Sequence, residues 1–351
     1  MNIYELWLIV ANISNESKIM LMEQYNNEEN IYNNIENIII KAYLRGKEGE
    51  RLKKTTLEEG YKLKKYIEKE NIEYITISNI KYPNKLRTIS NPPYVLFYKG
   101  NYDFIYDNMV GIVGSRKNTT YGEQVTKIIV NELLNTDYGV ISGVADGIDS
   151  VAHKSMLANG GKTIGVLGCG IDVVYPKINR NLYKRIEEEG LLLSEFIPGT
   201  SPFSYNFPKR NMIKSGLSKG VIVIEADYKS GSLITARYAA EQGRDVMAIP
   251  GSILNGKSRG CNKLLEVGAK IFVEIDDLYR FLNIAKNNKK NKEEKVIYSK
   301  ILELINDEPI HIDKIINNVK VDRMALFELL FEMQNKNEII CLPGNYYAKL
   351  S

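Results

Sequence analysis

The chain has 351 residues, of which 44% are hydrophobic and 26% charged, proportions typical of a soluble globular protein with two or three domains. The net charge of +4 is too small to indicate a nucleic-acid partner by itself, so the placement of the charges has to decide that question. The three cysteines are far apart in the sequence and there are only two histidines, which argues against a disulfide framework and a metal centre. The chain has no apolar run of about 18 residues, which argues against a membrane span. These features predict a cytoplasmic protein.

The first seventy residues carry apolar side chains at helical spacing, for example Ile31 and Ile38, and predict a small helical domain over residues 1–70. Between residues 72 and 100, an alternating run around Ile75 and two consecutive prolines predict short strands and turns. This stretch leads into the next domain.

From residue 109 to about 285, short β-rich runs alternate with helical stretches. The β-rich runs, such as GVISG, TIGVLGCG and GVIVIEAD, are apolar along nearly their whole length. Strands buried on both faces have this composition. The alternation therefore predicts an α/β domain over residues 71–285, with a parallel sheet and helices on both faces.

Residues 286–296 are polar and lysine-rich and predict a linker. Beyond it, residues 297–351 predict three helices and a β-hairpin around Gly344, the arrangement of a winged helix. The presumed recognition helix, near residues 322–334, carries three acidic side chains against one arginine. A helix that reads a DNA groove presents cations and amides instead, so we expect a protein-contact or regulatory role for this domain.

Four loops that follow predicted strands combine Gly or Ser with a cation. They run over residues 111–117, 203–219, 229–232 and 251–263. Ligands of open α/β sheets bind outside the carboxyl ends of the strands, where these loops would meet. A Gly/Ser loop before a helix also presents free N–H groups to an anion. The loops together predict a positive, phosphate-lined groove.

The second loop also carries aromatic side chains, because Phe203, Tyr205 and Phe207 alternate along it. Pro208 biases Phe207 away from helical angles, so we expect an extended backbone with the three rings on one face. Bases stack on such rings at about 1–3 kcal/mol each, while neighbouring cations neutralise phosphates. A buried aromatic cluster beside a solvated basic loop would have the same sequence, and the segment alone leaves both readings open.

No catalytic constellation stands out. The chain has neither a GxGxxG nor a Walker motif, and no serine has a complete His/Asp triad, so no cofactor and no enzymatic activity are expected. Asp149 lies four residues before His153, which allows a catalytic pair or metal site. The favoured interpretation is that Asp149 caps a helix and His153 satisfies a nearby polar group.

Taken together, the motifs of the α/β region resemble those of the DNA processing protein A family (DprA, also called Smf). The main matches are Gly111-Ile-Val-Gly-Ser-Arg116, Ser142-Gly143, Gly168-Cys-Gly-Ile-Asp172, Phe207-Pro-Lys-Arg-Asn211, Ser215-Gly-Leu-Ser218, Ser230-Gly-Ser232 and Gly260-Cys-Asn262. The resemblance implies an extended Rossmann-like core that binds single-stranded DNA without sequence preference. It also implies a homodimer that protects the strand and loads the RecA recombinase onto it, in natural transformation and competence or in recombination.

Carried over by motif, Arg116 would contact phosphate and Phe207 would stack on a base. Lys214 would replace the charge that relatives often carry at the position of Met212. The nucleic-acid-binding residues implied are Gly114, Ser115, Arg116, Ser142, Gly143, Gly170, Phe207, Lys209, Arg210, Asn211, Lys214, Ser230 and Ser232.

Two other functions stay open. A nucleotide-binding enzyme of the lysine-decarboxylase-like phosphoribohydrolase type has a related fold, but its PGGxGT loop is replaced by Asp227-Tyr-Lys-Ser-Gly-Ser232. A regulator that binds duplex DNA through the winged helix is disfavoured by the acidic helix.

Overall fold

A computed structural model describes residues 2–40, 44, 46–285, 297–305, 308–319, 323–336 and 338–350. The chain forms two compact units, Met1–Ile284 and Ala285–Ser351. The predicted linker, residues 286–296, lies outside the described residues. No helix within the described ranges is long and apolar enough to cross a bilayer.

The N-terminal segment is helical, as its apolar spacing predicts. Its helices are α1 (Ile3–Val10), α2 (Asn15–Tyr25), α3 (Glu28–Asn33), α4 (Ile35–Ile40), α5 (Lys47–Lys54) and α6 (Leu57–Lys69). Their buried side chains share one core with Tyr94 and Phe97, next to the first two strands of the sheet. Side-chain hydrogen bonds join the same surfaces, with Tyr94 donating to Glu28 at 2.9 Å and Tyr66 to Asp172 at 2.7 Å. The boundary at residue 70 stays a prediction.

A nine-stranded sheet follows, in the order β1-β2-β6-β5-β4-β3-β7-β8-β9. The strands are β1 (Glu73–Thr76), β2 (Val95–Gly100), β3 (Asn108–Val113), β4 (Tyr138–Ser142), β5 (Thr163–Val166), β6 (Leu191–Ser194), β7 (Ser218–Val223), β8 (Asp245–Ala248) and β9 (Lys270–Ile271). The seven strands from β6 to β9 in this order are parallel, whereas β1 and β2 add an antiparallel pair at one edge. The α/β fold is therefore confirmed, with a mixed edge that the sequence did not predict.

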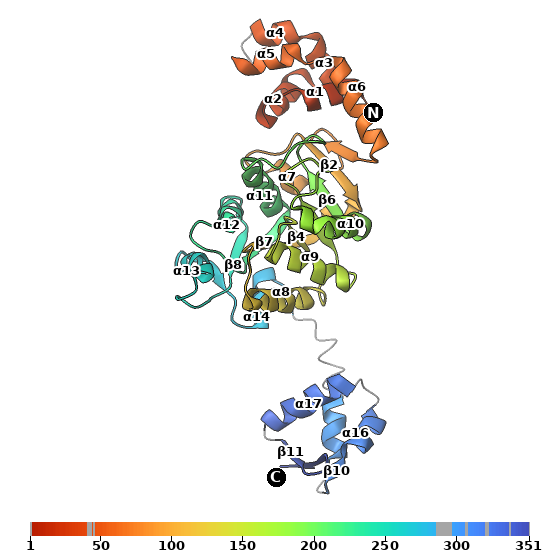
Figure 1. The fold of residues 1–351 in the computed structure, drawn as a ribbon, viewed down its shortest axis with the longest axis vertical. Helices are drawn as coiled ribbons and strands as arrows, with labels where there is room; N and C mark the ends of the chain where they lie inside the picture. The colour runs from red at the N-terminus through yellow and green to blue at the C-terminus, as the bar shows by residue number, and fades with distance from the viewer. Residues whose placement is uncertain are drawn as a thin grey trace. The chain divides into compact units, whose positions relative to one another are not determined.

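Helices cover both faces of this sheet (Figure 1). Val110 and Ile112 of β3 share a core with α8 (Thr120–Leu133), α9 (Ile148–Ala158) and α14 (Ile275–Leu282). Met109 and Val113, which alternate with them, pack toward α11 (Asn206–Leu217), α12 (Gly231–Glu241) and α13 (Arg259–Glu266). The other helices of this unit are α7 (Asn84–Arg87), α10 (Arg180–Glu189) and the short η1 (Tyr102–Tyr106), η2 (Lys177–Asn179) and η3 (Gly256–Ser258).

The strand order reverses beside β3. The chain builds β3, β4, β5 and β6 outward in one direction and then returns through α11 to place β7 on the other side of β3. The loops after β3 and β7 therefore lead away from each other and leave a crevice at the carboxyl ends of the strands. Open α/β sheets bind their ligands at such switch points.

The C-terminal unit has its own core, which includes Ile301, Ile315, Leu330 and Met333. Residues 297–304 are helical, and the other elements are β10 (Ile310–His311), α16 (Ile312–Val319), α17 (Arg323–Asn335), β11 (Ile339–Leu342) and β12 (Tyr346–Lys349). The predicted three helices and hairpin are present. Strand β10, which pairs with β12, was not predicted.

Candidate functional site

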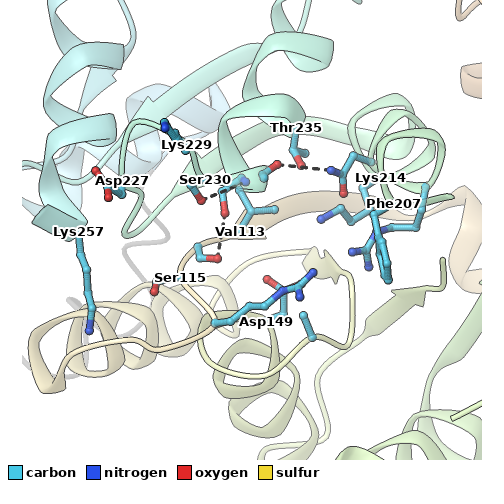
Figure 2. Close-up of a pocket in the computed structure, with 17 residues that line it drawn as sticks. Val113, Ser115, Asp149, Phe207, Lys214, Asp227, Lys229, Ser230, Thr235 and Lys257 are labelled. Carbon is cyan, nitrogen blue, oxygen red and sulfur yellow. Dashed lines mark hydrogen bonds between the residues drawn. The ribbon is translucent and has the colours of Figure 1, made fainter. Parts of the chain in front are cut away.

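The crevice at the switch point holds a cleft of about 380 Å³. In Figure 2, Lys229 and Lys257 lie on one side of it and Phe207 and Lys214 on the other. All four predicted basic loops contribute to its lining: Val113, Gly114, Ser115, Arg116, Ala145, Asp149, Phe207, Arg210, Asn211, Lys214, Asp227, Lys229, Ser230, Gly231, Ser232, Thr235 and Lys257.

The loop after β3 is held from two sides. Gly147, at φ +78°, approaches it so closely that a Cβ there would lie 2.2 Å from the Ser115 carbonyl oxygen. The next amide, that of Ile148, donates to the same oxygen at 3.2 Å. From the other side, Ser232 Oγ donates to the Gly114 carbonyl at 2.9 Å. The backbone of this loop is therefore fixed, while the side chain of Arg116 stays exposed at the mouth of the cleft.

The expectation of an extended backbone through Phe207 is wrong. Helix α11 begins at Asn206, and Tyr205 just before it already has helical angles, with φ −72° and ψ −12°. Pro208 is tolerated because amides of the first helical turn have no partner within the helix. As a result, Phe207 lines the cleft, whereas Phe203 and Tyr205 do not.

One face of α11 forms a wall of the cleft. Phe207, Arg210, Asn211 and Lys214 lie at positions i, i+3, i+4 and i+7, which share a side of a helix. Lys209 falls outside this face; it is exposed and does not line the cleft.

Arg210 lies inside the wall and is only 5% exposed. Its Nη1 donates to the Gly143 carbonyl at 2.6 Å and to the Val166 carbonyl at 2.9 Å, which joins the ends of β4 and β5. A Cβ at Gly143 would lie 1.9 Å from that nitrogen, so glycine leaves the path open. Burial lowers the pKa of Arg210, an effect that the nearby carboxylate of Asp149 opposes.

Lys214 is 3% exposed, and burial lowers its pKa to about 7. Arg210 and Arg116 lower it further, and Asp149 raises it. Its ammonium group forms no hydrogen bond or ion pair with any described residue. The Oδ1 of Asn211 and the Oγ1 of Thr235 are also buried without a partner in the described part of the chain.

Helix α12 begins at the edge of the cleft. Ser230 caps it by accepting a hydrogen bond from the Ser232 amide at 3.3 Å. The first amides of a helix and its dipole favour a bound anion. The buried hydroxyl of Thr235 lines the same cleft and can donate a hydrogen bond to an anion bound at this helix end.

A smaller pocket of about 170 Å³ adjoins the cleft and shares Arg116, Phe207 and Arg210 with it. Both guanidinium groups lie over the Phe207 ring, at 5.6 and 5.7 Å from its centre. Tyr175 contacts Phe207 with a centroid distance of 5.9 Å. A Cβ at Gly168 would lie 2.8 Å from the Phe207 ring, so the glycine makes room for it.

Four predicted site residues do not line the cleft: Gly143 lines only the smaller pocket, and Ser142, Gly170 and Lys209 line neither. The Ser142 hydroxyl is fully buried and donates to the Ile112 carbonyl at 2.6 Å. The Gly170 amide donates to the Thr200 carbonyl at 2.9 Å, and Lys209 is exposed elsewhere on α11. Conversely, Thr235 lines the cleft and Tyr175 lines the smaller pocket, and neither was predicted as a site residue. Thr235 follows Gly231 by one turn of α12, a spacing that marks it in the sequence.

Of the Asp149–His153 pair, only Asp149 lines the cleft. His153 is fully buried, its Nδ1 lies 2.7 Å from Thr163 Oγ1, and burial lowers its pKa to about 4. The prediction that it satisfies a nearby polar group is confirmed. Asp149 accepts from the Gly143 amide at 3.1 Å and does not cap the helix, whose N-cap is Gly147. No group of His, Cys, Asp and Glu side chains that could hold a metal ion occurs among the described residues.

Residues 73–283 match the family model of DNA recombination-mediator protein A. Among curated relatives, the DNA processing protein DprA of Streptococcus pneumoniae is 48% identical over 197 residues, which cover 56% of this chain and 70% of that protein. The protein Smf of Escherichia coli is 34% identical over 293 residues, or 80% of this chain and 78% of that one.

Two solved structures are also similar. The crystal structure of S. pneumoniae DprA superposes with a TM-score of 0.70 and 37% identity, over 80% of this chain and 98% of that one. A structure that concerns the single-stranded DNA binding mode of Helicobacter pylori DNA processing protein A gives a TM-score of 0.54 and 32% identity, over 60% and 94% of the two chains.

Proposed function

The chain belongs to the DNA recombination-mediator protein A family, and from this premise we propose that it binds single-stranded DNA, without sequence preference, in the cleft between β3 and β7. It protects the strand and loads the RecA recombinase onto it, in DNA uptake by transformation or in recombination. The similarity to the H. pylori protein, whose structure concerns single-stranded DNA binding, supports the first part of this proposal.

The observation that carries the proposal is the set of cations in the cleft. Five of them line it: Arg116, Arg210, Lys214, Lys229 and Lys257. None of the five forms an ion pair with a described residue, whereas exposed cations elsewhere commonly do. Two carboxylates, those of Asp149 and Asp227, line the same cleft and leave an excess of three positive charges when Lys214 is protonated. Phosphates of a bound strand would neutralise this excess.

The lack of sequence preference follows from the kind of contact available. Cations, helix-end amides and hydroxyls bind phosphates, which carry no sequence information. The rings of Phe207 and Tyr175 offer stacking faces, and every base can stack. We propose that phosphates lie in the larger cleft and that one base enters the smaller pocket beside Phe207.

Exposed apolar side chains support the further proposal of a homodimer. Strand β9 is an edge of the sheet, and Val267, Ile271 and Val273 at this edge are all exposed. Unpaired strand edges with apolar side chains tend to be covered by another chain. Light scattering of Val273→Asp should show a monomer if this edge forms the dimer, and an unchanged mass would remove this support.

Binding is tested with a fluorescent oligo-dT strand and its duplex counterpart across a salt series. The affinity of the unmodified chain for the single strand should fall with salt, with a slope of about −0.7 for each phosphate contact. Arg116→Ala should lower this affinity at every salt concentration. Arg185→Ala is the matched control, because it removes an exposed arginine of α10 that pairs with Glu189 outside the cleft.

Salt-insensitive binding, or equal binding by Arg116→Ala, would contradict the proposed site. Release of a base from a nucleoside monophosphate would instead favour the phosphoribohydrolase reading.

A further inference from the structure

A pair of aromatic rings lies just before α11 and has no role in the site described so far. The rings of Phe203 and Tyr205 stack at a centroid distance of 5.3 Å and an interplanar angle of 8°. They are 48% and 64% exposed, and neither belongs to the lining of the cleft or of the smaller pocket. Two large rings are thus presented to solvent in near-parallel planes.

The turn that carries these rings is fixed by hydrogen bonds. The Phe203 amide donates to the Ser201 carbonyl at 2.9 Å, and the Asn206 amide donates to the Phe203 carbonyl at 3.0 Å. The buried side chain of Asn206 reaches back to the Ser201 carbonyl at 3.3 Å. The backbone that carries the rings is therefore ordered before any ligand arrives, which lowers the entropic cost of stacking on them.

The pair lies next to the proposed path of the strand. Tyr205 precedes Phe207 by two residues, so their Cα atoms are at most about 7 Å apart. Lys209 lies exposed one helical turn after Tyr205, and no acidic side chain occurs from residue 196 to 224. The carboxyl of Glu195 lies near Lys209, but burial raises its pKa and so disfavours its negative charge. A strand that leaves Phe207 in this direction meets aromatic faces and positive charge.

We propose that the Phe203–Tyr205 pair is a second stacking site for single-stranded DNA, which receives a base of the same strand beyond the one at Phe207. This inference rests on the proposed function and extends its footprint. The charge around the rings favours a nucleic acid over an apolar protein surface as the occupant. Since each stacked base contributes measurably to affinity, loss of this site should weaken binding about tenfold.

The test is a double variant, Phe203→Leu with Tyr205→Leu, which keeps apolar bulk but removes both rings. Binding is measured against oligo-dT strands of increasing length at one salt concentration. The shortest strands that fill the central cleft should bind as they do to the unmodified chain, and longer strands should bind about tenfold more weakly. Phe327→Leu with Phe331→Leu is the matched control, since those two rings are also exposed and lie one turn apart on α17.

A second readout is positional. A photoreactive 5-iodouracil is placed in turn at each position of the strand. It should cross-link to the Tyr205 side chain from a nucleotide position next to the one that cross-links to Phe207. Unchanged affinity at every length, equal loss at every length, or no cross-link to Tyr205 each overturns the inference. Arg116→Ala separates the two proposals, because it should weaken binding at all lengths. If the unmodified chain binds no single strand, the proposed function fails and this inference fails with it.

Discussion

Raising the pH from 6 to 8 should weaken single-stranded DNA binding about tenfold through Lys214 alone. In the empty cleft its pKa is lowered to about 7, because the ammonium group is buried beside two arginines. A phosphate in the cleft favours the charged form and moves the pKa back toward the ordinary value of 10.5. Binding therefore takes up a proton whenever the free lysine is neutral.

The direction and size of the effect follow from these two states. Below about pH 6 both the free and the bound lysine are charged, and the affinity is independent of pH. Above pH 7 the free lysine is mostly neutral, so the affinity falls by up to tenfold, or about 1.4 kcal/mol, for each pH unit. Between pH 6 and pH 8 the affinity therefore falls about tenfold when the pKa of the bound lysine returns to its ordinary value.

Fluorescence anisotropy at constant ionic strength measures this dependence, and Lys214→Met should abolish most of it. Arg185→Ala should keep the full pH dependence. Calorimetry at pH 7 in buffers with different ionisation enthalpies should show uptake of about half a proton per complex. A flat profile for the unmodified chain, or the same slope in Lys214→Met, would refute this account of the buried lysine.

Three further predictions concern stability and the wall of the cleft. Gly143→Ala places a Cβ 1.9 Å from Arg210 Nη1, so thermal denaturation should occur at lower temperature and oligo-dT affinity should drop; unchanged values would mean that Arg210 moves aside without cost. Arg210→Met leaves the carbonyl groups of Gly143 and Val166 without this donor. The free energy of unfolding, measured in urea, should therefore fall by about 1–3 kcal/mol. An equally stable variant would show that burying the arginine charge costs as much as its hydrogen bonds contribute. Lys214→Met should be more stable than the unmodified chain at pH 7, because it removes a buried ammonium group whose pKa is lowered on folding. Between about pH 7 and 10.5 the unfolded unmodified chain binds more protons than the folded one, so the stability of the unmodified chain rises with pH across that window. Urea unfolding at pH 7 and 9 checks this, since the gap between the two proteins should narrow at the higher pH, and a variant less stable at both values would contradict it.

Much of the fold is predictable because the amino-acid composition of the strands identifies them. Parallel strands covered on both faces are apolar throughout, and runs such as GVIVIEAD are typical of that environment. The antiparallel pairing of β1 and β2 onto the same sheet is different. It depends on contacts between residues far apart in the chain, for which a single sequence holds no local signal.

The site is predictable in part for a related reason. Loops that follow parallel strands meet at one edge, so Arg116, Lys214 and Ser232 come together as expected. Helix phase decides the rest. At about 100° per residue, Phe207, Arg210 and Lys214 fall on one side of α11. Position 209 falls nearly opposite, so Lys209 does not line the cleft. The expectation of an extended backbone concealed the helical spacing that distinguishes Lys209 from Arg210.

The unpaired cations of the cleft have a practical consequence for anyone who handles this protein. Because these cations form no ion pair with the described residues and outnumber the two carboxylates of the cleft, any small polyanion that occupies it stabilises the fold by mass action. The melting temperature will therefore depend on whether the buffer contains phosphate or sulfate. Preparations from lysates will tend to carry nucleic acid with them, and a wash at high salt is the step that determines what a later binding experiment measures.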